Sequence, residues 1–163
     1  MRRLAIAALV VLTATATAAF TFANDSGYTS ADIMGAWTAV SVERTNEEGT
    51  TNNEITNPNM TLFTAGHYAN LRITGEGERE MLPEEPTDEQ RLAAYRRFQG
   101  NAGGYKVEGT TLSTKNKITR GPNGMADPQV NTSEIHIDGD TMHRTWTNEE
   151  NGNKFVVTYK RQD

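Results

Sequence analysis

The most informative absence from this sequence is cysteine, because none of its 163 residues is a cysteine. Disulfide bonds, on which many small exported domains depend when their hydrophobic core is thin, are therefore excluded. A lipid anchor attached to a processed N-terminal cysteine is excluded for the same reason. The chain must be stabilised by its own hydrophobic core, and about 140 residues are enough for one such domain.

Basic residues are also few. The chain has 16 Lys and Arg against 21 Asp and Glu, which gives a formal net charge of −5. The small basic clusters at Arg96–Arg97 and Lys115–Lys117 lie far apart in the sequence. Nucleic acids and anionic membrane surfaces are bound by clustered Lys and Arg. The composition therefore argues against both as partners.

A long, strongly apolar run is missing too, but a short one opens the chain. Arg2 and Arg3 precede an uncharged stretch over residues 4–20, and Ala23 is a small residue at the −1 position of a cleavage site. This pattern predicts a cleavable secretory signal over residues 1–23. Cleavage after Ala19 is an alternative.

The competing interpretation of this run is a transmembrane anchor. A spanning helix needs about 20 strongly apolar residues, and the run is diluted by Thr13, Thr15 and Thr17. We therefore expect a domain at 24–163 that is periplasmic or secreted and has no membrane anchor. Loss of the two leading arginines leaves 14 basic against 21 acidic residues, a net charge of −7.

Short alternating segments rich in Thr, Val, Ile and aromatic residues recur along this domain. Eight of them are predicted to be strands: 34–44, 59–64, 67–74, 104–108, 111–119, 129–137, 140–147 and 153–161. Tight turns separate most neighbours, and Asp138-Gly139 is a signal for a type I′ turn. We predict an all-β fold, an eight-stranded up-and-down antiparallel barrel, because closure removes exposed strand edges. A β-sandwich is the alternative, and the hairpin connectivity favours the barrel.

One helix is predicted between the third and fourth strands. Thr87 and Gln90 form a capping box at its start, and Gly100 occupies the position of a C′ glycine. Three apolar residues share one face of this helix: Leu92, Tyr95 and Phe98. We expect that face to pack on the sheet. A lid or a membrane-seeking helix is the alternative.

Several motifs, taken in order, resemble the bacterial lipocalin-like domain. Gly35-Ala36-Trp37 resembles the Gly-x-Trp signature of lipocalins. The remaining matches are Phe63–Tyr68, Tyr95–Gly109, Ile137–Asp140 and Tyr159–Arg161. The likeness covers nearly all of residues 33–161. The chain departs from animal lipocalins in lacking their cysteines and in its helix.

The resemblance implies a β-barrel cup that binds a small, usually apolar molecule. It also implies that Trp37 packs at the closed end and that Arg161, or Lys160 in its place, lies across the ring. This role is structural, since a cation–π contact contributes about 0.5–2 kcal/mol.

Alternation along each predicted strand selects the side chains that face the cup. From it we predict the ligand-binding residues Tyr105, Leu71, Asn116, Met142, Arg144, Trp146 and Phe155. The same alternation places His67 and Ile73 with Leu71, Ile118 with Asn116, and Glu43 with Trp37. Arg144 would meet a ligand carboxylate or hydroxyl, or else it pairs with Glu43 or reaches water.

No catalytic signature is present, since there is neither a nucleophile elbow nor a phosphate-binding glycine loop. Glu134, His136 and His143 share a face that would suit a metal, but alternation places that face outside. His67 could ligate haem, but it begins a predicted hairpin strand, and we favour its interpretation as a turn residue. We therefore predict neither a metal nor another cofactor.

The sequence thus predicts an exported lipocalin-like protein that binds a small apolar or amphipathic molecule. The alternative is an isomerase- or cyclase-like enzyme that uses Arg144, Glu43, Tyr105 or His67 inside the barrel. An interaction module would need a large exposed apolar patch, which the predicted outward residues do not suggest.

Overall fold

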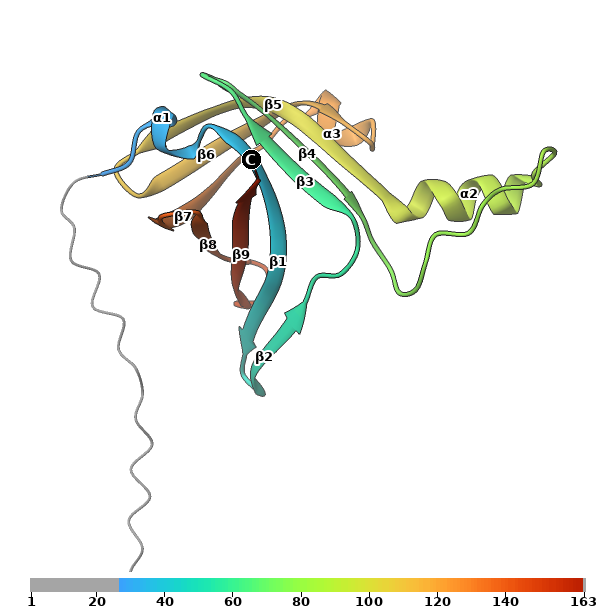
Figure 1. The fold of residues 1–163 in the computed structure, drawn as a ribbon, viewed down its shortest axis with the longest axis horizontal. Coiled ribbons are helices and arrows are strands. Elements are labelled where there is room, and N and C mark those ends of the chain that lie inside the picture. Colours follow the sequence, from blue (N-terminus) through green and yellow to red (C-terminus); the bar gives the residue numbers. More distant parts are fainter. Residues whose placement is uncertain (1–26, 163) are drawn as a thin grey trace, which may run out of the picture.

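The computed structural model describes residues 27–162, so the predicted signal segment lies outside the described residues. Nine strands and three short helices make up the described part of the chain (Figure 1). Their bounds are α1 Ser30–Ile33, β1 Gly35–Asn46, β2 Gly49–Glu54, β3 Asn59–Phe63, β4 His67–Ile73, α2 Asp88–Arg97, β5 Phe98–Glu108, β6 Thr111–Thr119, α3 Asn123–Ala126, β7 Val130–Asp138, β8 Thr141–Thr147 and β9 Lys154–Gln162.

The strands form one antiparallel sheet that closes on itself. The order is β2-β1-β3-β4-β5-β6-β7-β8-β9, and β1 also pairs with β9 along most of its length. Leaving β2 aside, each strand lies beside its sequence neighbours. The predicted eight-stranded up-and-down barrel is confirmed, with one additional strand. That strand shifts the helix to the connection between β4 and β5.

The additional strand β2 was not predicted because its sequence, Gly-Thr-Thr-Asn-Asn-Glu, has no apolar alternation and is exposed throughout. β2 and β3 share one edge of β1, with β3 along Gly35–Trp37 and β2 along Ser41–Asn46. Asn59 bridges the break between them. Its Oδ1 accepts from the Ala39 amide at 2.7 Å and its Nδ2 donates to the Ala39 carbonyl at 3.0 Å.

One end of the barrel is closed by α1. Ile33 and Trp37 are fully buried there, and the Trp37 indole Nε1 donates to the Ile33 carbonyl at 2.8 Å. The guanidinium carbon of Arg161 lies 4.1 Å from the Trp37 ring centroid. Its terminal nitrogens donate to the carbonyls of Met34 and Asp32. The contact predicted between Trp37 and Arg161 is present.

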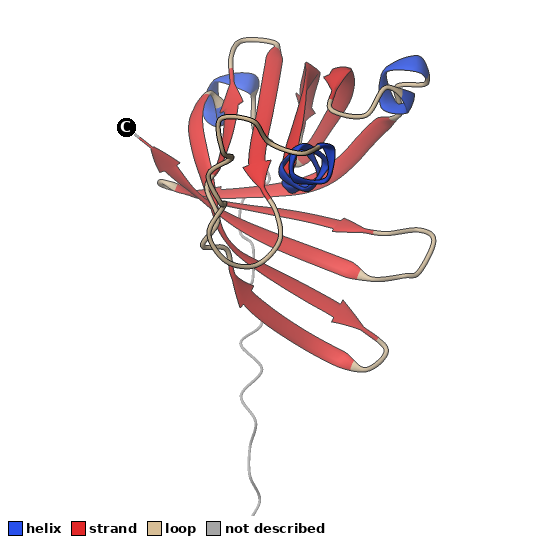
Figure 2. Cartoon of the chain, turned by 90° about the vertical axis from the view of Figure 1, so that its right-hand side faces the viewer, coloured by secondary structure: helices blue, strands red, loops and turns tan. Residues whose placement is uncertain are grey.

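The opposite end of the barrel is open because two strand pairs stop early. β3 pairs with β1 only over Gly35–Trp37, and β7 pairs with β6 only over Thr111–Lys115. Beyond these points the strands fan apart into two groups, as Figure 2 shows. We call the half of the barrel around Trp37 the closed half, and the fanned half the open half.

Two β-bulges exchange the inner and outer faces of strands. One lies in β1 between Ala39 and Ser41, and it turns Glu43 outward and Val42 inward. The other shifts the β5–β6 register at Ala102/Gly103 and turns Ile118 outward, where it is 60% exposed. A Cβ on Gly103 would lie 2.0 Å from a carbonyl oxygen of β6, so the close approach requires glycine there. The predicted inward orientations of Glu43 and Ile118 are therefore wrong.

The predicted inner face of β4 is wrong as well. Tyr68 is buried and Asn70 donates to the buried Thr61 hydroxyl, whereas Leu71 is 47% exposed on the outer face. His67 is exposed too, and it shares the outer phase with Leu71 and Ile73. The prediction followed hydrophobicity, but the inner face of β4 carries polar residues towards the open half.

The helix α2 begins as predicted, with reciprocal bonds between Thr87 and Gln90. It ends at Arg97, and the chain passes directly into β5, so Gly100 belongs to a strand and not to a helix cap. None of the residues of α2 is buried, and the helix projects away from the barrel (Figure 1). Its predicted packing on the sheet is wrong. No helix within residues 27–162 has the length and apolarity to span a membrane.

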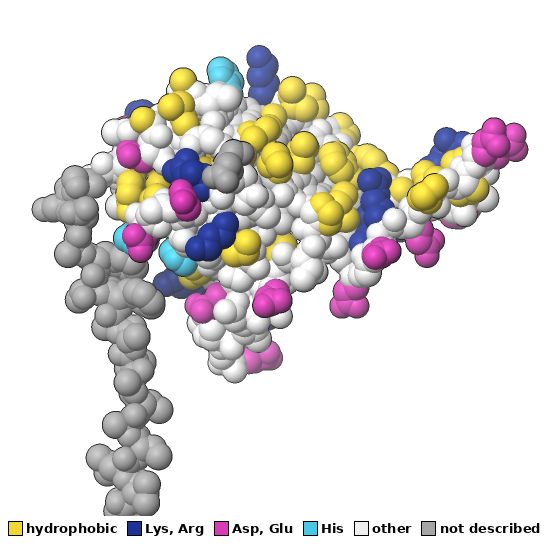
Figure 3. All heavy atoms as spheres, viewed as in Figure 1, with side chains coloured by type: hydrophobic (Ala, Val, Ile, Leu, Met, Phe, Trp, Pro, Cys, Tyr) yellow, Lys and Arg dark blue, Asp and Glu magenta, His cyan; other side chains and the backbone are white. Residues whose placement is uncertain are grey.

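These changes of phase leave an apolar surface on the outside of β3–β6. Its largest members are Met60, Leu62, Leu71 and Ile118, which are 43%, 41%, 47% and 60% exposed. Cross-strand register places Met60 beside Leu71, and Ala102 beside Ile118. Figure 3 shows hydrophobic side chains gathered over this part of the sheet. The expectation that no such patch exists is wrong.

Candidate functional site

The closed half is filled with side chains. Its buried residues form one cluster that comprises Ile33, Trp37, Ala39, Phe63, Tyr68, Leu112, Ile135, Met142, Val157 and Tyr159. Met142 is 1% exposed within it. This predicted ligand-binding residue therefore lies in the packed core, which leaves no room beside it for a ligand.

Tyr105 also belongs to the closed half. Its hydroxyl donates to the Thr64 carbonyl at 2.6 Å, and its ring meets that of Phe63 edge-on at 5.0 Å between centroids. Both contacts are internal to the fold. They give Tyr105 a structural task at the closed end.

The open half contains a pocket of about 320 Å³ on the inner side of β4–β6. Its lining is Asn70, Arg72, Gln99, Gly100, Asn101, Asn116, Thr119, Arg120, Gly121 and Gly124. None of these residues is acidic, and most are amides or cations. The Asn101 Oδ1 atom is buried and has no hydrogen-bond partner within residues 27–162. A buried acceptor without a donor is costly for the folded protein.

Two arginines of this lining have different surroundings. Arg120 donates to the carbonyls of Tyr95, Arg96 and Phe98, which end α2 and begin β5. Its charge therefore caps the helix and stabilises the base of the projecting arm. Arg72 is exposed on the inner phase of β4 and has no ion-pair partner within residues 27–162.

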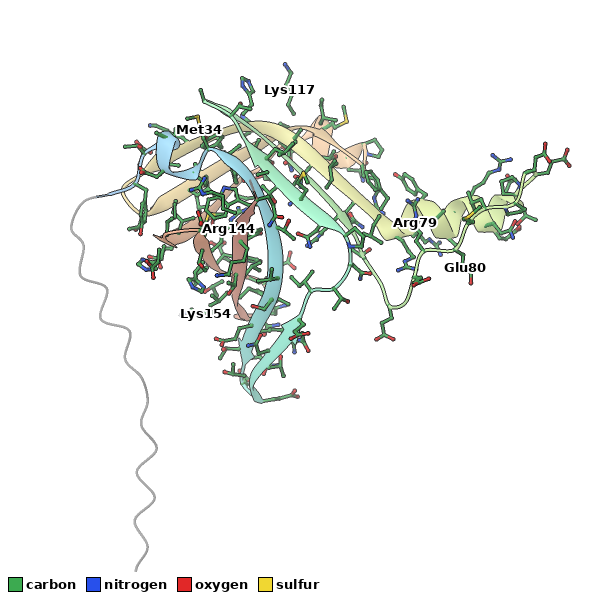
Figure 4. All side chains as sticks on the ribbon, in the orientation of Figure 1. Met34, Arg79, Glu80, Lys117, Arg144 and Lys154 are labelled. Carbon is green, nitrogen blue, oxygen red and sulfur yellow. The ribbon has the colours of Figure 1, made fainter. Side chains whose placement is uncertain are left out.

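Arg144 lies inside the ring of strands, on β8, as Figure 4 shows. Its Nε donates to the Ser133 hydroxyl at 2.7 Å, and that hydroxyl faces the Leu112 carbonyl at 3.4 Å. In the described part of the chain, no carboxylate lies within ion-pairing distance of Arg144. The predicted pairing with Glu43 is wrong, because the β1 bulge turns Glu43 to the outer face.

Tyr68 is an ionisable side chain on which the charge of Arg144 acts. Its hydroxyl donates to Asn116 Oδ1. Burial raises the pKa of Tyr68 above its ordinary value of 10.0, although a Thr114 hydrogen bond and the Arg144 charge act in the opposite direction. Tyr68 is therefore a neutral hydrogen-bond donor at physiological pH.

An aromatic pair lies nearer the rim of the open half. Trp146 on β8 and Phe155 on β9 are cross-strand partners. Their rings stack with centroids 5.4 Å apart and planes 17° apart. Both side chains are half-buried and point inward, in phase with Arg144 two residues along β8. The predicted inner faces of β8 and β9 are confirmed.

The predicted site residues therefore divide into three groups. Arg144, Trp146, Phe155 and Asn116 share the inner side of the open half, whereas Leu71 lies on the outside and Met142 and Tyr105 lie in the closed half. Three residues were missed: Tyr68, Asn70 and Asn101. Tyr68 and Asn70 were missed because the wrong face of β4 was predicted to point inward. Asn101 was missed because it lies between Gly100, predicted to end the helix, and residue 104, where the next strand was predicted to begin.

A second hollow of about 640 Å³ opens at the break between β2 and β3. Val40, Ser41, Asn52, Glu54, Ile55 and Thr56 line it. It contains none of the predicted ligand-binding residues. We therefore place the candidate site on the inner side of the open half, where Asn116 lines the smaller pocket and Arg144, Trp146 and Phe155 point inward.

The enzyme alternative requires four polar side chains to converge, and they do not. Glu43 and His67 are on the outer face, Tyr105 is in the closed half, and only Arg144 is inside the open half. Within residues 27–162, no three histidine or acidic side chains are grouped as a metal site. His136 and His143 stack at 6.5 Å, and the Tyr28 hydroxyl lies 3.2 Å from His136 Nδ1.

Comparison with known proteins adds little to this geometry. No protein-family model matches the sequence, and no curated protein matches it. Among solved structures, the chain is similar to an uncharacterized protein from Bacteroides eggerthii DSM 20697. That match has a TM-score of 0.44 and 13% sequence identity, and it covers 77% of this chain and 97% of the other.

Proposed function

We propose that this protein binds one small amphipathic molecule in the open half of its barrel. The observation that carries the proposal is the division of the interior. One half is packed with side chains, whereas the other has a pocket lined mostly by amides and arginines. In the same half, outside that lining, Arg144, Trp146 and Phe155 are half-buried and point inward. Binding sites for small molecules are typically concave and combine apolar walls with a few polar groups that fix orientation.

The resemblance to bacterial lipocalin-like domains supports the same proposal. The Gly35–Trp37 motif begins β1, and Arg161 covers the Trp37 ring at the closed end. This is the arrangement that the resemblance implies for a cup with one closed end. Our proposal departs from it in the ligand, because the polar lining of the pocket favours an amphipathic molecule over a purely apolar one.

Native mass spectrometry of protein purified from its own host tests this function. We expect an additional mass that is released under denaturing conditions. Phe155→Ser, on the inner face of β9, should reduce the bound fraction. Val156→Ser changes the neighbouring outward side chain and should not. A wild-type protein without any bound mass, or equal loss in both variants, would contradict the proposal.

We also propose that residues 1–23 direct export of the chain. The support is the sequence pattern alone, two arginines followed by an uncharged run and small residues. Cell fractionation with N-terminal sequencing tests it. The expected product lies outside the cytoplasm and begins at Asn24, and an uncleaved cytoplasmic chain would overturn the proposal.

A further inference from the structure

We propose that the ligand of the open half is a carboxylate amphiphile, with its carboxylate on Arg144 and its apolar part against Trp146 and Phe155. This inference rests on the proposed function. It goes beyond that function by naming the chemical class of the ligand and its orientation in the barrel.

The first support is the unneutralised charge of Arg144. A guanidinium has five N–H donors, and the one hydrogen bond that Arg144 makes uses Nε, towards Ser133. In the part of the chain that the structure describes, neither terminal nitrogen has a protein acceptor. Moving a cation out of water is costly unless a counter-charge accompanies it. The fold holds this guanidinium half-buried without supplying one.

The Ser133 bond also orients the group. Ser133 is buried in the closed half and fixes the Nε edge of the guanidinium. The edge formed by the two terminal nitrogens remains available for a partner. A carboxylate is a planar acceptor that matches this fork with two parallel bonds.

The neighbouring groups cannot take the place of that carboxylate. Tyr68 is close enough to Arg144 to be affected by its charge, and burial keeps the Tyr68 hydroxyl protonated because its pKa is raised. The pocket in the same half is lined by two further arginines and three asparagines and by no acid. The inner side of the open half therefore carries positive charge, although the whole chain has a net charge of −5.

The orientation of the ligand follows from the order of residues along β8. Arg144 precedes Trp146 by two residues on the same face, and the strand runs from the closed half towards the rim. Two residues along a strand span about 7 Å. A carboxylate on Arg144 thus leaves the next few carbon atoms beside the stacked rings of Trp146 and Phe155. These rings supply the apolar wall of the site.

Titration calorimetry with three eight-carbon probes tests the inference: octanoate, octanol and octylamine. Charge-assisted hydrogen bonds contribute enough for octanoate to bind wild-type protein roughly tenfold to a hundredfold more tightly than octanol. Octylamine should bind more weakly than octanol. Arg144→Gln should abolish the preference for octanoate, and Arg144→Lys should keep only part of it.

Lys154→Gln is the matched control, because Lys154 is an exposed cation at the same end of the barrel (Figure 4). It should leave the preference for octanoate unchanged. If Arg144→Gln does not fold, the comparison of the three probes on wild-type protein and on Arg144→Lys still decides the matter.

The possible failures are distinguishable. Equal affinities for octanoate and octanol, or an undiminished preference in Arg144→Gln, would overturn the carboxylate inference and leave the proposed function standing. Binding of none of the three probes would also overturn the inference. The native mass measurement then decides separately whether the barrel binds a small molecule at all.

Discussion

The closed and open halves of this barrel are built from the same strands, yet they differ in what the strands present to the interior. In the closed half, inward positions carry Trp37, Leu112, Ile135 and Met142, and these side chains belong to one buried hydrophobic cluster. In the open half, the same strands carry Asn116, Arg144 and Trp146, which are only half-buried. One end of the barrel therefore contains the packed hydrophobic core, and the other has polar side chains on its inner face.

The difference arises from pairing as much as from composition. Where every strand has two neighbours, inward side chains converge and fill the space. Where β3 leaves β1 and β7 leaves β6, the strands diverge and the inward side chains no longer meet. An eight-stranded barrel is just wide enough for its interior to be filled by side chains. A local loss of pairing is thus sufficient to open a pocket.

The largest expected effect separates the two tryptophans. Trp37→Ala should lower the free energy of unfolding by about 3–5 kcal/mol, because it removes a fully buried ring and its hydrogen bond to Ile33. Trp146→Ala, in the open half, should cost about 1 kcal/mol, since its ring is only half-buried. Urea unfolding followed by circular dichroism measures both. Equal losses would break the distinction between the two halves.

Substitution of two leucines gives the next test, since it compares the stability lost at an inner position with that lost at an outer one. Leu112→Ala should cost about 2–5 kcal/mol because Leu112 is completely buried. Leu71→Ala should cost less than about 1 kcal/mol, since Leu71 is 47% exposed on the outer face of β4. The same urea measurement applies. A large loss of stability in Leu71→Ala would indicate that Leu71 lies on the inner face of β4, as its hydrophobicity predicted.

Two asparagines compare a satisfied with an unsatisfied amide. Asn59→Ala removes three hydrogen bonds to the backbone of Ala39 and Asn57, and it should cost about 1–3 kcal/mol. Asn101→Ala removes a buried oxygen that has no partner. Its unfolding free energy should stay within about 1 kcal/mol of wild type or rise. A marked loss in Asn101→Ala would show that its oxygen has a partner in solution.

The smallest expected effect is a pH dependence on the outer side of the closed half. Burial, the neighbouring His136 and Lys160 lower the pKa of His143 below its ordinary value of 6.5, whereas Asp138 raises it. The unfolded chain then binds more protons than the folded one as pH falls through 6.5. Stability is therefore fully present above that pH and declines below it.

His143→Asn should remove this part of the pH dependence. Urea unfolding at several pH values between about 5 and 8 measures it, since the ordinary histidine pKa lies in this range. The slope of stability against pH should be smaller in the variant than in wild type. An unchanged slope would mean that His143 titrates normally in the folded protein.

Much of the fold could be predicted from the sequence because it depends on local patterns. Alternation identified all eight strands of the barrel, and the Thr87–Gln90 capping box marked the start of α2. β2 could not be found, because a strand of Gly, Thr, Asn and Glu has no apolar face. The start of β5 was also missed, since Gly100 was interpreted as the end of a helix and the strand was predicted to begin at residue 104.

The candidate site was predicted only where a strand keeps its phase. β8 and β9 have no bulge in their mutual register, so alternation placed Arg144, Trp146 and Phe155 correctly on the inner face. In β1 and β6 a bulge inserts one residue and moves every later side chain to the other face. Bulges depend on the partner strand, which no local pattern encodes.

The sequence by itself determined that this protein has no disulfides, that its domain is a barrel of hairpin-linked strands, and that Trp37 and Arg161 belong to its closed end. The first two properties follow from composition, from period-two alternation and from turn residues, which are all local, and the third follows from the resemblance to lipocalins. Only the tertiary structure decided that the barrel opens at the opposite end, that Leu71 and Ile118 lie outside, and that no carboxylate of the described residues lies beside Arg144. These depend on where pairing stops and where bulges fall, and both are settled between strands rather than within them.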